Sequence, residues 1–382
     1  MEMETEKEER RGRGGTLAIE GVRQANGKKG PNTNRQPESV DSTDNSLAVG
    51  SMRVTRRSLV RAGNPGSLEL FEDSLSRVAG DPKNAFLKQL DNAPENLNLF
   101  KADMLDYEAV TAAFSGCEGV FHVASPVPID KMVDKETEMM APTVNGTMNV
   151  LKACSAMSVQ KLIVVSSGAA VTLNPNWSQD KLKDENCWSD KQFCKENEIW
   201  YALAKTEAEE MALEYAEKSG LHVITFCPGA VFGPLLQSDV INITTKYLRY
   251  IIKGGPDIIN NKFWPIVDVR DVADALLLLY HKAGSSQRYI CSEHQIDIKD
   301  LIDLIKSMYP DYGYADKLVD VDYKLAMSSD KLKNLGWQAR TLEETLADSV
   351  ESYEKSGILL LQDVDGQPCR VPYFYRMPPI QE

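Results

Sequence analysis

The chain has 382 residues, of which 42% are hydrophobic and 26% charged, and its formal net charge at pH 7 is -13. This length and composition are typical of one large α/β domain, or of two smaller domains, with a buried core. The acidic balance argues against nucleic acid and anionic membrane surfaces as main partners, because both require concentrated Lys and Arg.

Residues 1–70 differ in composition from the rest of the chain. They contain no Phe, Trp or Tyr, so that Phe71 is the first aromatic residue, and they are rich in Gly, Asn, Ser, Arg and Glu. Such a stretch cannot bury enough apolar surface to offset the entropy lost on ordering. We therefore expect residues 1–70 to be a disordered, low-complexity extension.

From about Arg77, short apolar runs alternate with helical patterns. Each run contains Val, Ile, Phe or Leu, as in strands that are covered on both faces. The predicted strands are Leu97–Lys101, Gly119–Ser125, Lys161–Ser167 and His222–Pro228, and the predicted helices between them are Asp106–Phe114, Lys135–Met157 and Tyr201–Ser219. This alternation predicts an α/β fold with a Rossmann-type, doubly wound parallel sheet over residues 71–235.

After residue 235 the predicted strands and helices no longer alternate regularly. We expect a helix around Ile241–Lys253, a strand at Arg288–Cys291, and amphipathic helices at Ile298–Tyr309 and Leu342–Glu354. They suit a smaller substrate-binding part, residues 236–360, packed over the carboxyl ends of the sheet. The last residues, 361–382, carry Pro and Arg and are expected to form a loose tail.

A first chemical signal lies at the start of a predicted helix. Tyr201 and Lys205 are spaced i, i+4 and therefore lie on one helix face. A nearby ammonium group favours phenolate over phenol, so we expect Lys205 to lower the pKa of Tyr201 toward working pH. Tyr201 can then exchange a proton with a carbonyl or alcohol oxygen. Alone, such a pair is more often an ordinary feature of a surface helix.

A second signal is the hydroxyl group of Ser167, at the carboxyl end of a predicted strand. Doubly wound sheets bind their ligands at this edge. Ser167 is placed there to hydrogen-bond a substrate oxygen on which charge develops. A turn or a helix cap at Ser166 and Ser167 is the alternative interpretation.

Together with further motifs, these residues carry a family resemblance. From about Arg77 to about Leu360 the chain resembles the extended short-chain dehydrogenase/reductase superfamily, and within it the plant cinnamoyl-CoA reductase and dihydroflavonol reductase branch. Besides Ser167, Tyr201 and Lys205, the matching segments are Asp81–Asn84, Lys101–Asp106, Gly119–Pro126, Thr143–Thr147, Pro228–Pro234 and Asp268–Ala273.

The resemblance implies a plant oxidoreductase of phenylpropanoid or lignin metabolism that reduces carbonyl compounds or CoA thioesters with NADPH. It implies that Ser167 orients and polarises the carbonyl, that Tyr201 is the general acid, and that Lys205 holds the nicotinamide ribose and tunes Tyr201. The other residues that it implies at the cofactor are Asp103 and Met104 at the adenine, Val123, Ala124 and Ser125 beside the ribose and pyrophosphate, and Pro228, Gly229, Ala230 and Val231 over the nicotinamide.

Two basic residues, Arg77 and Lys83, favour NADP(H) over NAD(H). In folds of this kind a base near the end of the second strand binds the ribose 2′-phosphate. The family tends to place an Arg just before the Asp-Pro pair, where this chain has Gly80. Two solvated surface cations are the alternative interpretation.

One family feature is missing from the pattern. The family opens with a strand and a Gly-x-x-Gly-x-x-Gly turn at a helix N-terminus, where the pyrophosphate binds. Gly12–Gly15 precedes no adequate apolar run, and Gly63–Gly66 lacks a third glycine and follows the basic segment Met52–Arg57. We therefore expect the first βα unit to be lacking and cofactor affinity to be weak. Our hypothesis is an alternative or mis-assembled gene product whose catalytic half is intact.

The substrate and the class of reaction stay open. Cinnamoyl-CoA reductases resemble one another in Asn-Trp-Tyr-Cys-Tyr-Gly-Lys, whereas residues 199–205 read Ile-Trp-Tyr-Ala-Leu-Ala-Lys, which favours an aldehyde or ketone over a thioester. One alternative is a sugar-nucleotide epimerase or dehydratase, which would retain NAD. Another is a degenerate reductase that is inert or pairs with an intact paralogue.

The remaining features concern metals, thiols and location. The four histidines, His122, His222, His281 and His294, show no close metal-ligand spacing, so no metal site is expected. The seven scattered cysteines suggest reduced thiols, and no apolar run is long enough to span a bilayer. The N-terminus has no apolar core of a secretory signal. We therefore expect a cytoplasmic protein that binds a small-molecule substrate, without a nucleic-acid or membrane partner.

Overall fold

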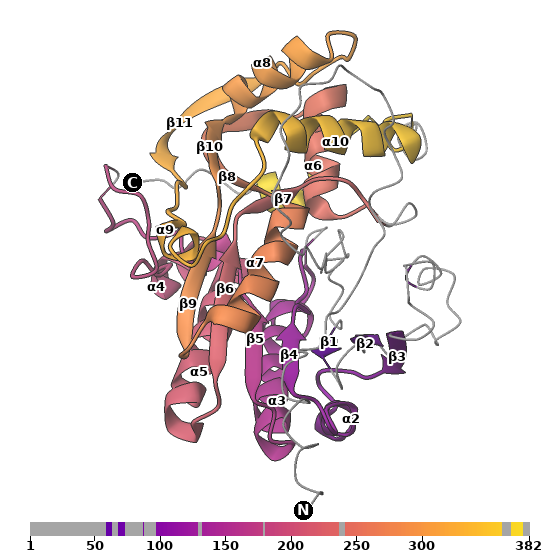
Figure 1. Ribbon diagram of the computed structural model, residues 1–382. Helices are drawn as coiled ribbons and strands as arrows, with labels where there is room; N and C mark the ends of the chain where they lie inside the picture. Colours follow the sequence, from indigo (N-terminus) through magenta and orange to yellow (C-terminus); the bar gives the residue numbers. More distant parts are fainter. Residues whose placement is uncertain are drawn as a thin grey trace, which may run out of the picture.

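The computed structural model describes residues 59–62, 68–72, 87, 97–128, 132–178, 180–236, 241–360 and 368–376. Two sheets organise this part of the chain, and Figure 1 shows the larger sheet below the smaller one. Within the described residues, no helix has the length and apolar character needed to cross a membrane.

The larger sheet has seven strands in the order β3-β2-β1-β4-β5-β6-β9. Their bounds are β1 Leu59–Ala62, β2 Leu68–Glu72, β3 Leu97–Lys101, β4 Gly119–His122, β5 Lys161–Val165, β6 Val223–Pro228 and β9 Gln287–Cys291. The neighbours β2–β3, β4–β5, β5–β6 and β6–β9 are parallel. Flanking helices complete the doubly wound Rossmann-type fold, which confirms the predicted fold class.

Helices cover both faces of this sheet. Leu162 and Val164 of β5 pack in one apolar cluster with residues of the helices on one face, and Ile163 packs in a second cluster with the helix on the other. Burial on both faces explains why β5 reads as a continuous apolar run. The first face carries α2 Tyr107–Ala113, α3 Ala141–Ala156 and α5 Trp200–Ser219, and the second carries α7 Val269–Lys282.

The smaller sheet runs β10-β8-β11, with β7 paired to β8. Its bounds are β7 Ala230–Phe232, β8 Ile259–Asp268, β10 His294–Asp297 and β11 Leu318–Lys324. One apolar cluster joins it to α6 Ile243–Lys253, α8 Ile298–Met308 and α10 Leu342–Lys355. The remaining short helices are η3 Glu136–Met140, η4 Gly168–Ala170, α4 Lys191–Glu196, α9 Asp330–Lys333 and η6 Tyr373–Arg376.

The sheets do not divide at the predicted boundary of residue 235. Strand β7 lies before this boundary yet pairs with β8 of the smaller sheet, and β9 lies after it yet pairs with β6 of the larger sheet. The reason is α7, which begins directly after β8 and leads the chain back to the larger sheet. In Figure 1, α7 stands between the two sheets.

Strand β1 runs against the direction of the rest of the larger sheet. It is antiparallel to both of its neighbours, with Leu59 opposite His122 and Ala62 opposite Gly119. Only residues 63–67 join it to β2, and a parallel crossover needs a dozen residues or more. The expected lack of a family-type first βα unit therefore agrees with this topology. The expectation of disorder up to residue 70 was wrong for β1 and for the start of β2; residues 1–58 lie outside the described part.

The C-terminal tail was expected to be loose, and residues 368–376 correct this expectation. The Asp257 carboxylate accepts a hydrogen bond from the Val371 backbone N–H at 2.9 Å and forms an ion pair with Arg370. Val371 is buried in the core of the smaller sheet. The polar anchor at Asp257 and the apolar contact of Val371 explain why this part of the tail is held.

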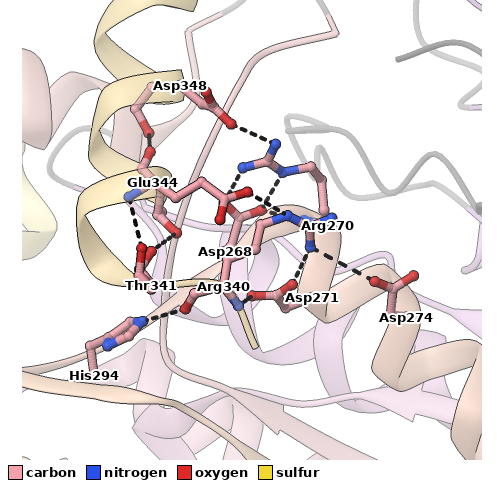
Figure 2. Close-up of polar contacts among 11 residues, drawn as sticks. Asp268, Arg270, Asp271, Asp274, His294, Arg340, Thr341, Glu344 and Asp348 are labelled. Carbon is pink, nitrogen blue, oxygen red and sulfur yellow. Dashed lines mark hydrogen bonds and ion pairs between the residues drawn. The ribbon is translucent and has the colours of Figure 1, made fainter. Parts of the chain in front are cut away.

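Ion pairs tie the start of α7 to α10 (Figure 2). Asp268 caps α7, and Arg270 pairs with Asp268 at 2.7 Å and with Asp348 of α10 at 2.6 Å. Beside them, Arg340 forms an ion pair with the buried Asp271, whose second oxygen accepts the Arg340 backbone N–H at 2.8 Å. These contacts join the helix between the two sheets to a helix of the smaller one.

Candidate active site

The carboxyl ends of the parallel strands meet at one edge of the larger sheet. Val123–Ser125 directly follow β4, Ser167 lies just beyond β5, and Gly229–Val231 directly follow β6. Asp103 and Met104 follow β3 at the same edge. In doubly wound sheets this is the edge at which ligands bind.

Ser167 occupies the turn between β5 and the short helix η4. Its hydroxyl oxygen accepts a hydrogen bond from the backbone N–H of Ala169 at 3.1 Å, so Ser167 is the N-cap of η4. Space beside the next residue is tight: a Cβ on Gly168 would lie 2.9 Å from the flexible end of the Met327 side chain and 3.2 Å from the Pro228 carbonyl oxygen. The alternative interpretation of Ser167 as a helix cap is therefore correct, and capping leaves its hydroxyl hydrogen available to a second partner.

Tyr201 and Lys205 lie on the first turns of α5, and both side chains are buried. The Ser167 hydroxyl lies close enough to Tyr201 to lower the pKa of that phenol. The Lys205 ammonium group donates to the carbonyl oxygen of Val165, the last residue of β5, at 3.0 Å. The structure thus brings together the three residues that the sequence singled out.

The direction of the Tyr201 pKa corrects the sequence-based expectation. Burial raises the pKa of Tyr201, and the nearby Ser167 hydroxyl only partly opposes this. Burial also lowers the pKa of Lys205 from 10.5 to about 8, while Cys227 and Glu209 act in the opposite direction. Tyr201 is therefore a protonated phenol at neutral pH, which is the form that can donate a proton.

His122, at the end of β4, lies beside this group without a catalytic contact. Its ring Nε2 is 3.0 Å from the Thr147 hydroxyl. Burial, and next the charge of Lys205, lower the pKa of His122 to about 3, so the ring is neutral at neutral pH. His122 is therefore a packed, uncharged residue beside the site.

The residues expected along the cofactor after β3 and β4 are divided between half-buried and buried positions. Asp103 is half-buried, and its carboxylate accepts the Leu105 backbone N–H at 2.9 Å. Met104 is packed in the apolar core, and its carbonyl oxygen accepts the Asn149 amide at 2.9 Å. Of the residues after β4, Val123 is half-buried and Ser125 is buried, with its hydroxyl oxygen 3.4 Å from that of Thr143. Asp103 and Val123 therefore expose more surface for a ligand than Met104 and Ser125.

The segment after β6 lies close to the smaller sheet. The Gly229 backbone N–H donates to the Cys291 carbonyl oxygen at 2.9 Å. A Cβ on Gly229 would lie 2.2 Å from the Pro265 carbonyl oxygen of β8, so no side chain fits at this position. This close approach holds Pro228, Ala230 and Val231 at the junction of the two sheets.

The side that would hold the cofactor's phosphates differs from the family pattern. Because β1 is antiparallel, its C-terminal residue Ala62 pairs with Gly119, at the start of β4. The link over residues 63–67, which contains the whole Gly63–Gly66 segment, therefore leaves from the opposite edge to that of Ser167. At the edge of Ser167 the described residues offer the buried Lys205 ammonium group as a hydrogen-bond donor and provide no glycine-rich cradle for a pyrophosphate. Arg77 and Lys83 lie outside the described residues.

Sequence reasoning missed two aromatic residues near Tyr201. The ring of Phe374 packs edge-on against Tyr201, with ring centroids 5.2 Å apart. The ring of Tyr375 lies 4.3 Å from that of Tyr247 and 4.9 Å from that of Trp264. Three consecutive aromatics in an otherwise polar, Pro-bearing tail were the signal that could have revealed them.

Comparisons with known proteins agree with this geometry. The model of the NAD dependent epimerase/dehydratase family matches residues 76–291. Cinnamoyl-CoA reductase 1 of Petunia hybrida is 37% identical over 298 residues, which cover 76% of this chain and 87% of that protein. Tetraketide alpha-pyrone reductase 1 of Arabidopsis thaliana is 31% identical, over 73% of this chain and 86% of that protein.

Solved structures are similar over the same range. The crystal structure of vestitone reductase from alfalfa has a TM-score of 0.63 and 27% identity, and the match covers 75% of this chain and 90% of that one. Gre2 of Candida albicans in complex with NADPH has a TM-score of 0.63 at 24% identity, covering 75% of this chain and 91% of that one, a likeness of fold alone.

Proposed function

Because the chain belongs to the NAD dependent epimerase/dehydratase family, and within it to the cinnamoyl-CoA reductase and dihydroflavonol reductase branch, we propose that it is an NADPH-dependent carbonyl reductase. The observation that carries this proposal is the meeting of Ser167, Tyr201 and Lys205 at the carboxyl edge of the sheet. The names of its relatives favour a reductase over a sugar-nucleotide epimerase.

In this proposal Tyr201 is the general acid. NADPH, when bound, supplies the hydride that attacks the carbonyl carbon. As negative charge develops on the carbonyl oxygen, the phenol of Tyr201 donates its proton to that oxygen, and the raised pKa of Tyr201 keeps this proton in place until then. Ser167 donates a hydrogen bond to the same oxygen and fixes its position.

Lys205 holds the ribose and supports Tyr201 in this proposal. Its ammonium group already lies between α5 and the end of β5, because it donates to the Val165 carbonyl oxygen. The residues proposed to hold the rest of NADPH are Asp103, Met104, Val123, Ala124, Ser125, Pro228, Gly229, Ala230 and Val231, with Arg77 and Lys83 at the 2′-phosphate. The support for the residues after β3, β4 and β6 is their place at one edge of the sheet.

The proposed substrate is a phenylpropanoid-like aldehyde, ketone or CoA thioester. It would lie between Tyr201 and the smaller sheet, where the half-buried Phe374 and Tyr375 provide aromatic surface and the buried Trp264 packs against Tyr375. Aromatic side chains suit a planar aromatic substrate, because offset and edge-on ring contacts are favourable.

The test is NADPH oxidation by the purified chain. Cinnamaldehyde, feruloyl-CoA and a dihydroflavonol are supplied in turn, and each rate is compared with that of the Tyr201→Phe variant. The proposal expects turnover with at least one of them and a large loss in the variant. Turnover that is equal in both proteins would exclude Tyr201 as the acid.

A second candidate is a catalytically impaired relative that binds NADPH weakly. The antiparallel direction of β1, with its short link to β2, favours it, because a pyrophosphate needs backbone N–H groups at a glycine-rich turn. An NADPH titration by calorimetry decides between the two, beside a chimaera that carries a family-type first βα unit. Tight, stoichiometric binding by the unmodified chain would exclude the impaired form.

A further inference from the structure

A carboxylate lies buried directly beneath the candidate site. Glu209 is one helical turn beyond Lys205 on α5, and its side chain is 0% exposed. It accepts hydrogen bonds from the hydroxyl groups of Ser166, at 2.7 Å, and Thr225, at 2.8 Å. The Cys227 thiol donates to it as well, at 3.2 Å.

The counter-ion of Glu209 comes from the last strand of the larger sheet. Arg288 of β9 donates from Nε to Glu209 at 2.8 Å, and its side chain is also buried. Its guanidinium group donates to the Ala170 carbonyl oxygen at 2.9 Å and to the Cys187 carbonyl oxygen. The guanidinium carbon lies 3.7 Å from the ring centre of Trp188.

These bonds hold the chain on both sides of Ser167. Ser166, directly before it, is bound to Glu209, and Ala170, which ends η4, is bound to Arg288. Glu209 in turn is part of the helix that carries Tyr201. We propose that Glu209 and Arg288 are positioning residues, which together fix the hydroxyl of Ser167 opposite the hydroxyl of Tyr201.

The chemistry of the Glu209–Arg288 ion pair suits a role in positioning Ser167 better than a role in stabilising the fold. Buried ion pairs can often be replaced by apolar residues of similar volume without loss of stability. Charge-assisted hydrogen bonds, by contrast, are short and directional. A carboxylate only accepts hydrogen bonds, so it can accept from Ser166, Thr225, Cys227 and Arg288 together. In Glu209→Gln one of the two carboxylate oxygens would be replaced by an NH2 group, which donates two hydrogen bonds and accepts none.

The first experiment compares Glu209→Gln with Glu210→Gln. Glu210 is the next residue of α5 and pairs with Lys191 at the surface, so it is the matched control. This experiment rests on the proposed reductase activity. We expect kcat to fall roughly a hundredfold in Glu209→Gln, the loss typical of a catalytic group displaced by about 1 Å, with the Kd for NADPH unchanged. Unchanged kcat in a folded Glu209→Gln protein would overturn the proposal.

The double variant Glu209→Met/Arg288→Met separates positioning from stability. It removes both charges and keeps comparable volume, so its melting temperature should be near that of the wild type. A positioning role predicts that kcat stays low in this stable protein. Full recovery of kcat would show a purely structural pair. Should this variant fail to fold, Ser166→Ala removes one bond next to Ser167 and leaves the ion pair intact; about tenfold lower kcat supports the proposal, and an unchanged kcat contradicts it.

A readout that needs no turnover completes the test. In protein with 13C-labelled tyrosine, the NMR signal of Tyr201, assigned by its loss in Tyr201→Phe, reports the surroundings of its hydroxyl group, which include the Ser167 hydroxyl. We expect Glu209→Gln to shift this signal in the same direction as Ser167→Ala, and Glu210→Gln to leave it in place. An unmoved signal in Glu209→Gln would overturn the positioning role. A wild-type chain without turnover would instead count against the proposed reductase and leave this measurement valid.

Discussion

The ring of Phe374 stands edge-on against the ring of Tyr201, at an interplanar angle of 89° and a centroid distance of 5.2 Å. It brings the end of the chain to the residue that we propose as the general acid. The ring of Tyr375, which follows, continues the contact to Tyr247 and Trp264 of the smaller part. The tail therefore joins the acid to the aromatic surface proposed for the substrate.

Replacing Phe374 by Ala tests this contact. We expect the free energy of unfolding to fall by about 1–3 kcal/mol, because an edge-on aromatic pair and part of the buried ring area are lost. The KM of an aromatic substrate should rise several-fold, with little change in the Kd for NADPH. Tyr373→Ala is the control, because the Tyr373 ring is 39% exposed. Equal effects of the two variants, measured by urea unfolding and steady-state kinetics, would argue against a specific role of Phe374.

Replacing Tyr201 by Phe tests the acid directly. The change removes only the hydroxyl group, so the fold and the contact with Phe374 should persist. We expect kcat to fall by roughly 10²–10⁴, the usual contribution of a positioned general acid. Tyr215→Phe is the control on the same helix, because the Tyr215 hydroxyl bonds the Ser155 hydroxyl at 3.1 Å on an exposed surface. A loss of similar size in both variants would indicate a defect of the helix rather than of proton transfer.

Periodicity predicted the larger elements well, because strands covered on both faces and amphipathic helices leave strong patterns. The strand predicted at Leu97–Lys101 agrees with β3 at both ends, and the helix predicted at Tyr201–Ser219 agrees with α5 to within one residue. The direction of a strand relative to its neighbours was harder to predict. The apolar residues of a four-residue strand do not indicate whether it runs parallel or antiparallel to its neighbours. The antiparallel direction of β1 is therefore known only from its pairing with β2 and β4 in the structure.

Only those residues of the candidate site that a local sequence pattern identifies could be predicted. The pair Tyr201 and Lys205 follows from helix geometry, and Ser167 from the end of a strand. The charge environment does not follow, since burial raises the pKa of Tyr201 and the group that opposes this is the Ser167 hydroxyl rather than the Lys205 ammonium. The contact of Phe374 with Tyr201 links residues far apart in the sequence, and no local pattern specifies such a contact.

The ion pair of Arg340 and Asp271 gives a prediction about stability (Figure 2). Arg340→Ala leaves the buried Asp271 carboxylate without its counter-ion, and we expect a loss of about 2–3 kcal/mol in the free energy of unfolding. Asp274→Ala removes a second, exposed partner of Arg340 at 3.8 Å and should cost less than about 1 kcal/mol. Urea unfolding midpoints measure both. Similar midpoints for the two variants would show that burial of Asp271 does not strengthen the pair.

Lys205 gives a prediction about the pH dependence of stability. Burial lowers its pKa from 10.5 to about 8, so between these values the unfolded chain binds a proton that the folded protein has released. The free energy of unfolding therefore gains a contribution that increases as the pH rises from about 8 to 10.5, by at most about 3 kcal/mol. Below about pH 8 the folded protein keeps Lys205 charged and buried, so burial of this charge lowers the free energy of unfolding by its full amount.

The measurement is a series of unfolding curves between pH 7 and 10.5 for the wild type and for Lys205→Met. The groups that interact electrostatically with Lys205 are His122 of β4, Glu209 of α5 and Cys227 of β6. Tyr201 lies one helical turn before Lys205 on α5. Burial raises the pKa values of Tyr201 and Cys227, and their titration changes stability in the opposite direction. The Lys205 contribution is therefore the difference between the two curves: the wild type should gain on the variant as the pH rises. A constant difference would mean that the folded protein keeps the Lys205 proton up to its ordinary pKa, in contact with the Val165 carbonyl oxygen.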